Sequence, residues 1–144
     1  MGTRLPGASG ALTSMAPVWV NSEDDALVYA QALESATRLR MAAPTWVESM
    51  QVITARRGDL GQADLAELLS RLAVEVVPCD ADLARVAYEA WRHFGKGSHP
   101  AGLNFGDCFP YALAKQRGEP LQFNGGGFSL TDLSAALTGE DASV

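Results

Sequence analysis

Two acidic residues, Asp107 and Glu48, lie where the sequence predicts the first turns of helices. Asn104 is a good N-cap residue, with Phe105 as the first helical residue, so Asp107 would lie in the first turn. Free backbone N–H groups and the helix dipole would lower the pKa of Asp107 and fix its direction. The structural alternative is an acidic capping residue. Several carboxylates that converge on one point would bind Mg2+, which prefers oxygen ligands.

Glu48 belongs to a second predicted helix, which Pro44 can open at its first turn. Gly58 ends this helix. Glu48 lies beside the apolar face, where an exposed glutamate would be equally ordinary. The apolar face consists of Trp46, Val47, Met50 and Ile53.

The rest of the chain predicts short strands that alternate with helices. Such alternation requires crossover connections, so it indicates an α/β fold with a parallel sheet. The predicted strands are 39–42, 74–77 and 120–123; the predicted helices are 24–35, 62–72, one from Asp80 or Asp82 to about His93, and a short last one from Thr131.

Composition narrows the class of protein further. The 144 residues suffice for one domain, and no apolar run is long enough to span a membrane. The N-terminus lacks a secretion signal, so we expect a cytoplasmic protein with Cys79 and Cys108 as free thiols. A net charge of −6 argues against loose binding of nucleic acid, although a local basic patch would suffice for RNA.

One stretch carries a family resemblance. Residues 103–114, LNFGDCFPYALA, resemble the LNFGDCFAYALA signature of VapC-type PIN domains, and the likeness continues through residues 118–123 and 128–133. These are small Mg2+-dependent ribonucleases that act as toxins in toxin–antitoxin pairs. The resemblance implies a PIN-like three-layer α/β/α fold with a short central parallel sheet, as a single domain over residues 1–144. Within it, residues 1–22 match the family's first strand and loop poorly, and residues 139–144 form a frayed tail.

The family uses four acids to hold the metal, and only two are present here. By resemblance, Glu48 and Asp107 are the catalytic and metal-binding acids. The other two positions fall on Leu12 and Gly127, neither of which has a carboxylate. With fewer acids, Glu48 and Asp107 should repel each other less and ionise more normally. Pro110 also departs from the family, and inside a helix it would distort the turn beside Asp107.

Other residues have candidate supporting roles. Thr13 and Ser14 match the family's polar pair near the metal, and Asp132 is a possible substitute acid that more simply supports the last helix. Basic residues before the signature helix would contact the RNA backbone, and a solvated loop is the alternative. These basic residues are Arg92, Lys96 and His99.

The expected function is therefore that of a VapC-like endoribonuclease with reduced or lost activity, binding Mg2+ or Mn2+ weakly. The resemblance implies a VapB-like antitoxin, an RNA substrate and a homodimer as partners, and no membrane. An inactive PIN domain that acts only by binding an antitoxin is the alternative function. A third reading is that residues 1–22 come from a shifted reading frame, which would not explain Gly127.

Overall fold

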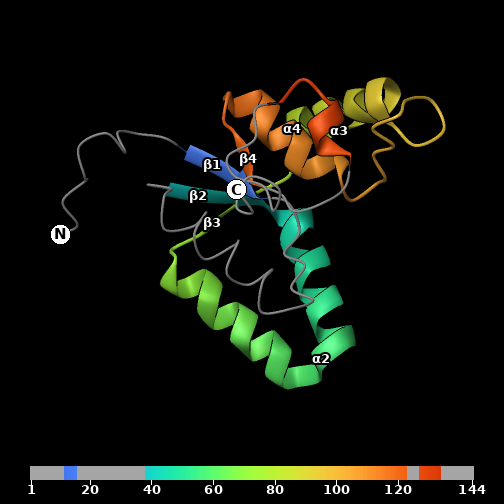
Figure 1. Cartoon of the computed structure of the whole chain (residues 1–144). Helices are drawn as coiled ribbons and strands as arrows, with labels where there is room; N and C mark the ends of the chain where they lie inside the picture. Colours follow the sequence, from blue (N-terminus) through green and yellow to red (C-terminus); the bar gives the residue numbers. More distant parts are fainter. Residues whose placement is uncertain (1–11, 16–37, 123–126, 134–144) are drawn as a thin grey trace, which may run out of the picture.

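A computed structural model describes residues 12–15, 38–122 and 127–133 of the chain. Four parallel strands form one sheet in the order β3-β2-β1-β4 (Figure 1). The register places Ser14 of β1 beside Arg40 of β2 and Leu121 of β4. The strands are β1 (Leu12–Met15), β2 (Arg38–Ala42), β3 (Glu75–Val77) and β4 (Leu121–Gln122).

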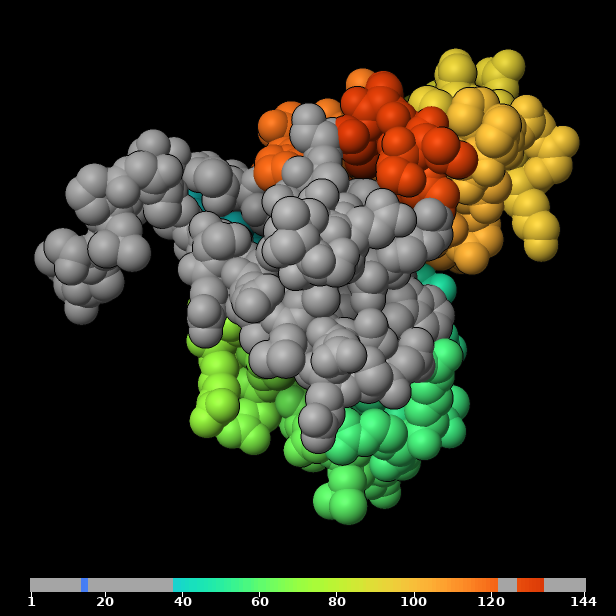
Figure 2. Space-filling model, in the orientation of Figure 1, coloured from blue at the N-terminus to red at the C-terminus, as the bar shows by residue number. Residues whose placement is uncertain are grey.

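Helices cover both faces of this sheet, so the expected three-layer α/β/α fold is confirmed (Figure 1). Figure 2 shows the green atoms of α2 and the yellow and orange atoms of α3 and α4 on opposite sides of the molecule. Alternation along β2 turns Leu39 and Met41 toward α2, and Ala42 toward α4. Because helices cover both faces of the sheet, most side chains of its parallel strands are expected to be apolar. The helices are α2 (Ala43–Arg71), α3 (Ala81–Phe94) and α4 (Cys108–Arg117), followed by the 3-10 turn η1 (Phe128–Leu130).

Helix α2 consists of two arms that meet at Gly58, as the V of Figure 1 shows. Gly58 has φ 65° and ψ −157°, a conformation that strains a residue with a side chain. The predicted end at Gly58 and the predicted helix at 62–72 therefore appear as a bend and a second arm. Ile53 of the first arm and Leu65 and Leu69 of the second pack on the same core as Met15.

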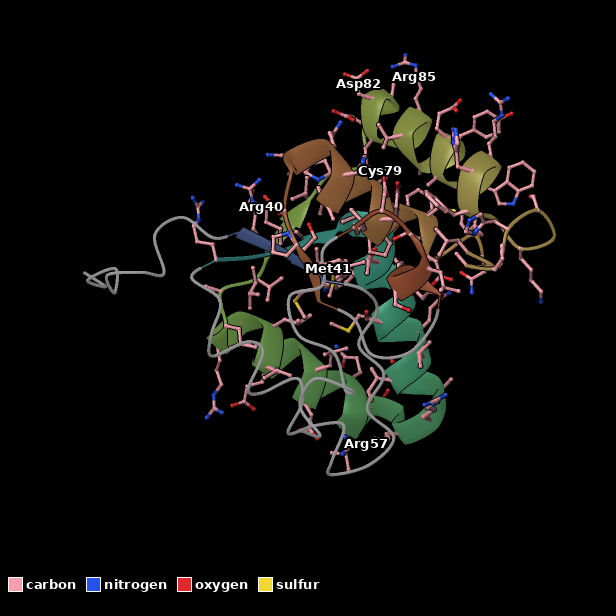
Figure 3. All side chains as sticks on the ribbon, turned by 45° about the horizontal axis from the view of Figure 1, so that its top comes forward. Arg40, Met41, Arg57, Cys79, Asp82 and Arg85 are labelled. Atoms are coloured by element: carbon pink, nitrogen blue, oxygen red, sulfur yellow. The ribbon has the colours of Figure 1, made fainter. Side chains whose placement is uncertain are left out.

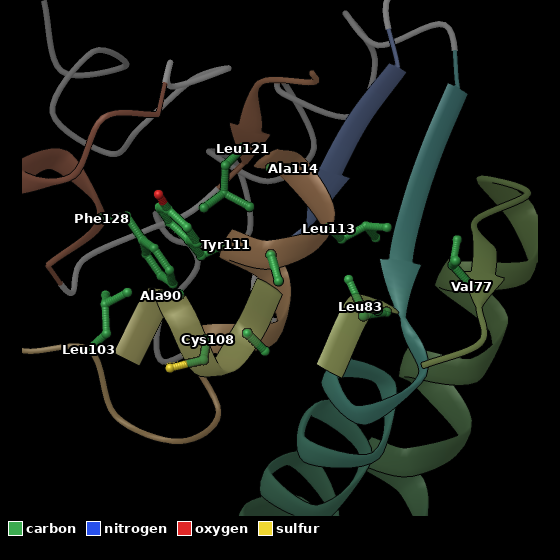
Figure 4. Close-up of a cluster of buried hydrophobic side chains, with 13 residues drawn as sticks. Val77, Leu83, Ala90, Leu103, Cys108, Tyr111, Leu113, Ala114, Leu121 and Phe128 are labelled. Atoms are coloured by element: carbon green, nitrogen blue, oxygen red, sulfur yellow. The ribbon is translucent and has the colours of Figure 1, made fainter. Parts of the chain in front are cut away.

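On the other face, α3 and α4 pack against each other and against the sheet. The Asp80 carboxylate accepts a hydrogen bond of 2.8 Å from the Leu83 N–H, which caps α3 as predicted. Figure 4 shows the core that results, with side chains from both helices and from β4. This core fixes the start of α4, where Asp107 lies.

Within residues 1–22, Leu12–Met15 form the inner strand β1, and the buried Ser14 hydroxyl of this strand donates a hydrogen bond to Glu119. The predicted last helix differs from the structure. The last helix does not begin at Thr131: η1 ends at Leu130, and Thr131 is already extended. The predicted helix 24–35 lies outside the described residues.

The free thiols expected at Cys79 and Cys108 are confirmed. In the part of the chain that the structure describes, no helix combines the length and the apolar character that a bilayer crossing requires.

Candidate metal centre

Glu48 and Asp107 meet where the first arm of α2 passes the start of α4. Both residues are half-buried. The Glu48 carboxylate lies against Gly106, the residue before Asp107, so the two acids belong to one neighbourhood. The structure thus brings together the two acids that the sequence selected.

Gly106 makes this approach possible. A Cβ atom added at Gly106 would lie 2.4 Å from Glu48 Oε1 and 2.5 Å from Oε2. Any side chain at this position would therefore push the Glu48 carboxylate away. Sequence reasoning missed this role, although the position of Gly106 immediately before Asp107 was a usable signal.

The turn before α4 holds the Asp107 carboxylate in place. The Asn104 N–H donates to Asp107 Oδ2 at 3.0 Å, and the Asp107 N–H donates to Asn104 Oδ1 at 2.9 Å. This reciprocal pair resembles a capping box. Regular helix begins at Cys108 with Asp107 as its N-cap residue, so the prediction of Asn104 as N-cap and Phe105 as first helical residue was wrong.

The later helix start also removes the distortion expected at Pro110. Pro110 lies in the first turn of α4, where its missing N–H would have no intrahelical partner. The prolyl side chain is fully buried. The prediction of a distorted helix beside Asp107 was therefore wrong.

Burial raises the pKa of both acids, which corrects the predicted low pKa of Asp107 and the normal ionisation of the pair. For Glu48 the burial effect is larger than the effect of the Asp107 charge, and both raise the pKa. For Asp107, the hydrogen bond from Asn104 offsets the burial effect only in part. Two half-buried acids with raised pKa values favour a cation beside them.

An unpartnered oxygen supports the same conclusion. Glu48 Oε1 is buried and has no hydrogen-bond partner, and neither has Thr45 Oγ1 one turn earlier. Residues three apart share a helix face, so Thr45 belongs to the same side of α2 as Glu48. A divalent cation fits this donor set, because Mg2+ binds through one or two carboxylates and keeps several waters. Among the described residues no group of three or more metal-ligating side chains occurs.

The structure also explains why Gly127 carries no acid. A Cβ at Gly127 would lie 1.6 Å from the backbone oxygen of Ala101, so even alanine would displace backbone there. Leu12 begins β1, and its side chain lies outside the described part of the chain. Close packing of two backbone segments therefore leaves no room for a side chain at position 127.

Two of the supporting candidates have structural partners elsewhere. The Ser14 hydroxyl donates to Glu119 Oε2 at 3.0 Å, and Arg40 Nη1 lies 3.5 Å from Glu119 Oε1. The Tyr111 hydroxyl donates to Asp132 Oδ1 at 2.6 Å, and Lys115 Nζ donates to Asp132 Oδ2 at 2.5 Å. These bonds favour a structural role for Asp132. The Thr13 side chain lies outside the described residues.

The basic candidates lie along the end of α3 and the loop that follows. Arg92 Nη1 lies 3.4 Å from Glu89 Oε1 on the same helix. His99 Nδ1 accepts a hydrogen bond from the Ala101 N–H, and the His99 ring packs on Phe94. Lys96 is exposed, and its backbone N–H donates to Leu103. The structure gives these residues local partners and does not test an RNA contact.

Cys108, next to Asp107, is not suited to act as a nucleophile. Burial raises the pKa of the Cys108 thiol to about 11, with a smaller effect from the Asp107 charge. The thiol is therefore protonated at neutral pH, whereas the thiolate is the reactive form.

The family model of the PIN domain matches residues 13–132 of this chain. Ribonuclease VapC of Mycolicibacterium smegmatis is 42% identical over 123 residues, which cover 85% of this chain and 95% of the relative. Ribonuclease VapC30 of Mycobacterium tuberculosis is also 42% identical, over 122 residues that cover 85% and 93%. The chain belongs to the VapC-type PIN-domain family.

Solved structures show the same fold at low sequence identity. VapC20 of M. tuberculosis, described as a sarcin-ricin loop cleaving toxin, matches with a TM-score of 0.67 at 16% identity, over 84% of this chain and 95% of that chain. FitAcB from Neisseria gonorrhoeae matches with a TM-score of 0.53 at 18% identity, over 85% and 95%.

Proposed function

We propose that this chain is a VapC-like toxin that hydrolyses RNA with a divalent cation, Mg2+ or Mn2+, held by Glu48 and Asp107. One observation carries the proposal: a buried Glu48 oxygen without a hydrogen-bond partner lies against Gly106, within the field of the Asp107 charge. The ribonuclease names of relatives at about 42% identity support it.

Each residue of the site then has a defined task. Glu48 and Asp107 supply the anionic oxygens, and the Asn104 turn keeps Asp107 oriented before any cation arrives. Because the pKa values of both acids are raised, protons and a cation would compete for these oxygens. When bound by Glu48 and Asp107, such a cation would supply an activated water and offset the charge of the phosphate.

Two carboxylates hold a cation less firmly than four. We therefore propose weak cation binding and slow RNA cleavage compared with a VapC toxin that has all four acids. The packed backbone at Gly127 favours a second candidate, an inactive PIN domain that acts only by binding its antitoxin. A VapB-like antitoxin, assembly as a homodimer and a cytoplasmic location are proposed for either candidate, on the likeness to VapC proteins.

The deciding experiment compares Asp107→Asn with Asp82→Asn. Both changes remove one carboxylate near a helix start, but Asp82 lies on α3 in an exposed ion pair with Arg85 (Figure 3). Calorimetric titration with Mg2+ and cleavage of a broad RNA panel would be measured for the full chain. We expect Asp107→Asn to lower both by tenfold or more, and Asp82→Asn to leave both unchanged.

A folded wild-type chain that binds no Mg2+ or Mn2+ and cleaves none of the RNAs would contradict the nuclease proposal. Retained binding of an antitoxin by that chain would support the second candidate.

A further inference from the structure

The first turn of α2 contains a buried hydroxyl that has no hydrogen-bond partner in the described part of the chain. Thr45 is 1% exposed, and its Oγ1 atom is buried. The buried serines differ from it: Ser14 donates to Glu119, and the Ser49 hydroxyl donates to the Thr45 carbonyl oxygen at 2.9 Å. A buried polar group without a partner costs stability, and buried polar groups of native proteins are partnered by protein or by water. The Thr45 hydroxyl is thus open to a group from outside the chain.

Thr45 and Glu48 lie on one side of α2. They are three residues apart, which makes them neighbours on the helix surface. The solvent side of this turn is formed by Trp46 and Val47, which are 38% and 48% exposed, whereas Thr45 and Ser49 are buried. Glu48 lies between these two sides, since it is half-buried and its Oε1 atom is buried without a partner. Two oxygens without partners therefore lie one turn apart on the inward side of α2.

A cation can reach Glu48 from solvent. Glu48 lines a groove of about 350 Å3 together with Gly106, the residue before Asp107, and Glu48 is the only charged residue that lines it. Mg2+ that is bound through one or two carboxylates keeps several of its waters. Such a water directs its oxygen at the cation and its two protons away from it, so it needs two acceptors. Carboxylate and hydroxyl oxygens are both acceptors, and Glu48 Oε1 and Thr45 Oγ1 are without partners.

We propose that Thr45 is a positioning residue of the cation site: its hydroxyl oxygen and Glu48 Oε1 together accept the protons of one water in the hydration shell of the cation. The inference rests on the proposed cation site at Glu48 and Asp107 and adds a third protein oxygen to it. A hydroxyl oxygen is neutral, so it supports the cation without adding a third negative charge to two acids that already repel each other.

Thr45→Val tests the hydroxyl, because valine keeps the branched shape and lacks the oxygen. Calorimetric titration of the full chain with Mg2+ should show an affinity about tenfold lower, the lower range for removing a group that supports a metal site. Thr45→Ser keeps the hydroxyl and should retain the wild-type affinity. Thr54→Val is the matched control, because Thr54 is an exposed threonine of the same helix. Its Mg2+ affinity should equal that of wild type.

Urea unfolding in the presence of a chelator separates positioning from a structural role. Without a cation, Thr45→Val should be at least as stable as wild type, because the hydroxyl that it removes has no partner in the described chain. Adding Mg2+ should then raise the urea midpoint of wild type more than that of Thr45→Val. A Thr45→Val chain that is less stable than wild type in chelator would assign the hydroxyl to the fold and overturn the inference. Equal Mg2+ affinity of Thr45→Val and wild type, or an equal loss in Thr54→Val, would also overturn it.

The inference and the nuclease proposal fail in different ways. If wild type and Thr45→Val bind Mg2+ equally and both cleave RNA, only the inference about Thr45 is overturned. If Mg2+ binding depends on the Thr45 hydroxyl but wild type cleaves none of the RNAs, only the nuclease proposal is overturned. A wild-type chain that binds neither Mg2+ nor Mn2+ would overturn both.

Discussion

Two glutamates of this molecule, the buried Glu119 and the half-buried Glu48, have opposite surroundings. Glu119 is 7% exposed, and its carboxylate lies between Arg40 Nη1 at 3.5 Å and the Ser14 hydroxyl at 3.0 Å. Both glutamates have a buried Oε1 without a hydrogen-bond partner, but the charge that acts on Glu48 is the like charge of Asp107. Charge is compensated at the sheet, where it serves the fold, and left uncompensated at the site where a cation would bind.

The largest expected loss of unfolding free energy comes from removing one partner of the buried Arg40–Glu119 ion pair. Arg40→Ala would leave the Glu119 carboxylate buried without its countercharge, which costs about 3–5 kcal/mol of unfolding free energy. Urea unfolding of wild type and Arg40→Ala would measure this difference in unfolding free energy. Arg57→Ala is the control, because the Arg57–Asp64 pair is exposed and should contribute less than about 1 kcal/mol (Figure 3). Similar losses for the two variants would show that Glu119 is not compensated as described.

The second-largest effect is expected on the Mg2+ affinity of the site formed by Glu48 and Asp107. Gly106→Ala places a Cβ against the Glu48 carboxylate, which can rotate away because it is the end of a flexible side chain. We expect Mg2+ affinity to fall by about tenfold, the usual lower range for disturbing the support of a ligand. The melting temperature should change little.

Calorimetry of the double variant provides the control for Gly106→Ala. In an Asp107→Asn background, Gly106→Ala should cause no further loss of affinity. An additive loss would indicate that Gly106 acts on metal binding by another route.

The sequence predicted strands β2, β3 and β4 and the extent of α3, and it singled out Glu48 and Asp107, because periodicity and a long signature are local properties. It placed the start of α4 at Phe105 instead of Cys108. It predicted the pKa of Asp107 incorrectly, because burial depends on how α2 passes α4. It also missed Gly106, whose role depends on the distant Glu48. Ser14 was matched to a polar pair near the metal, and its hydrogen-bond partner Glu119 is 105 residues away in the sequence.

A smaller effect is expected on the unfolding free energy when Glu48 is replaced. The pKa of Glu48 in the folded chain is raised above its ordinary value of 4.5. The folded state therefore holds more protons than the unfolded state from about that pH upward, and stability falls as pH rises through this window. Glu48→Gln removes this loss, so the variant should be more stable at pH 7 by less than about 1 kcal/mol.

Urea unfolding between pH 4 and 8 in the presence of a chelator would measure the effect of Glu48→Gln. Adding Mg2+ should then stabilise wild type more than the variant. A variant that is less stable than wild type at pH 7 without metal would show that Glu48 serves the fold.

The smallest effect has the opposite sign and sharpens the comparison between the two kinds of carboxylate. Hydrogen bonds from Lys115 and Tyr111 hold the pKa of Asp132 below its ordinary value of 3.8. The unfolded state then holds more protons, so the contribution of Asp132 is present above about pH 4 and is lost as pH falls through the lowered pKa. Asp132→Asn should therefore cost about 0.5 kcal/mol at pH 7, since the Lys115 pair is half-exposed, and almost nothing in strong acid. Glu48→Gln and Asp132→Asn, measured across the same pH series, should give stability changes of opposite sign that both shrink toward low pH. Changes of the same sign would mean that both carboxylates support the fold, and the contrast between compensated and uncompensated acids would no longer identify the metal centre.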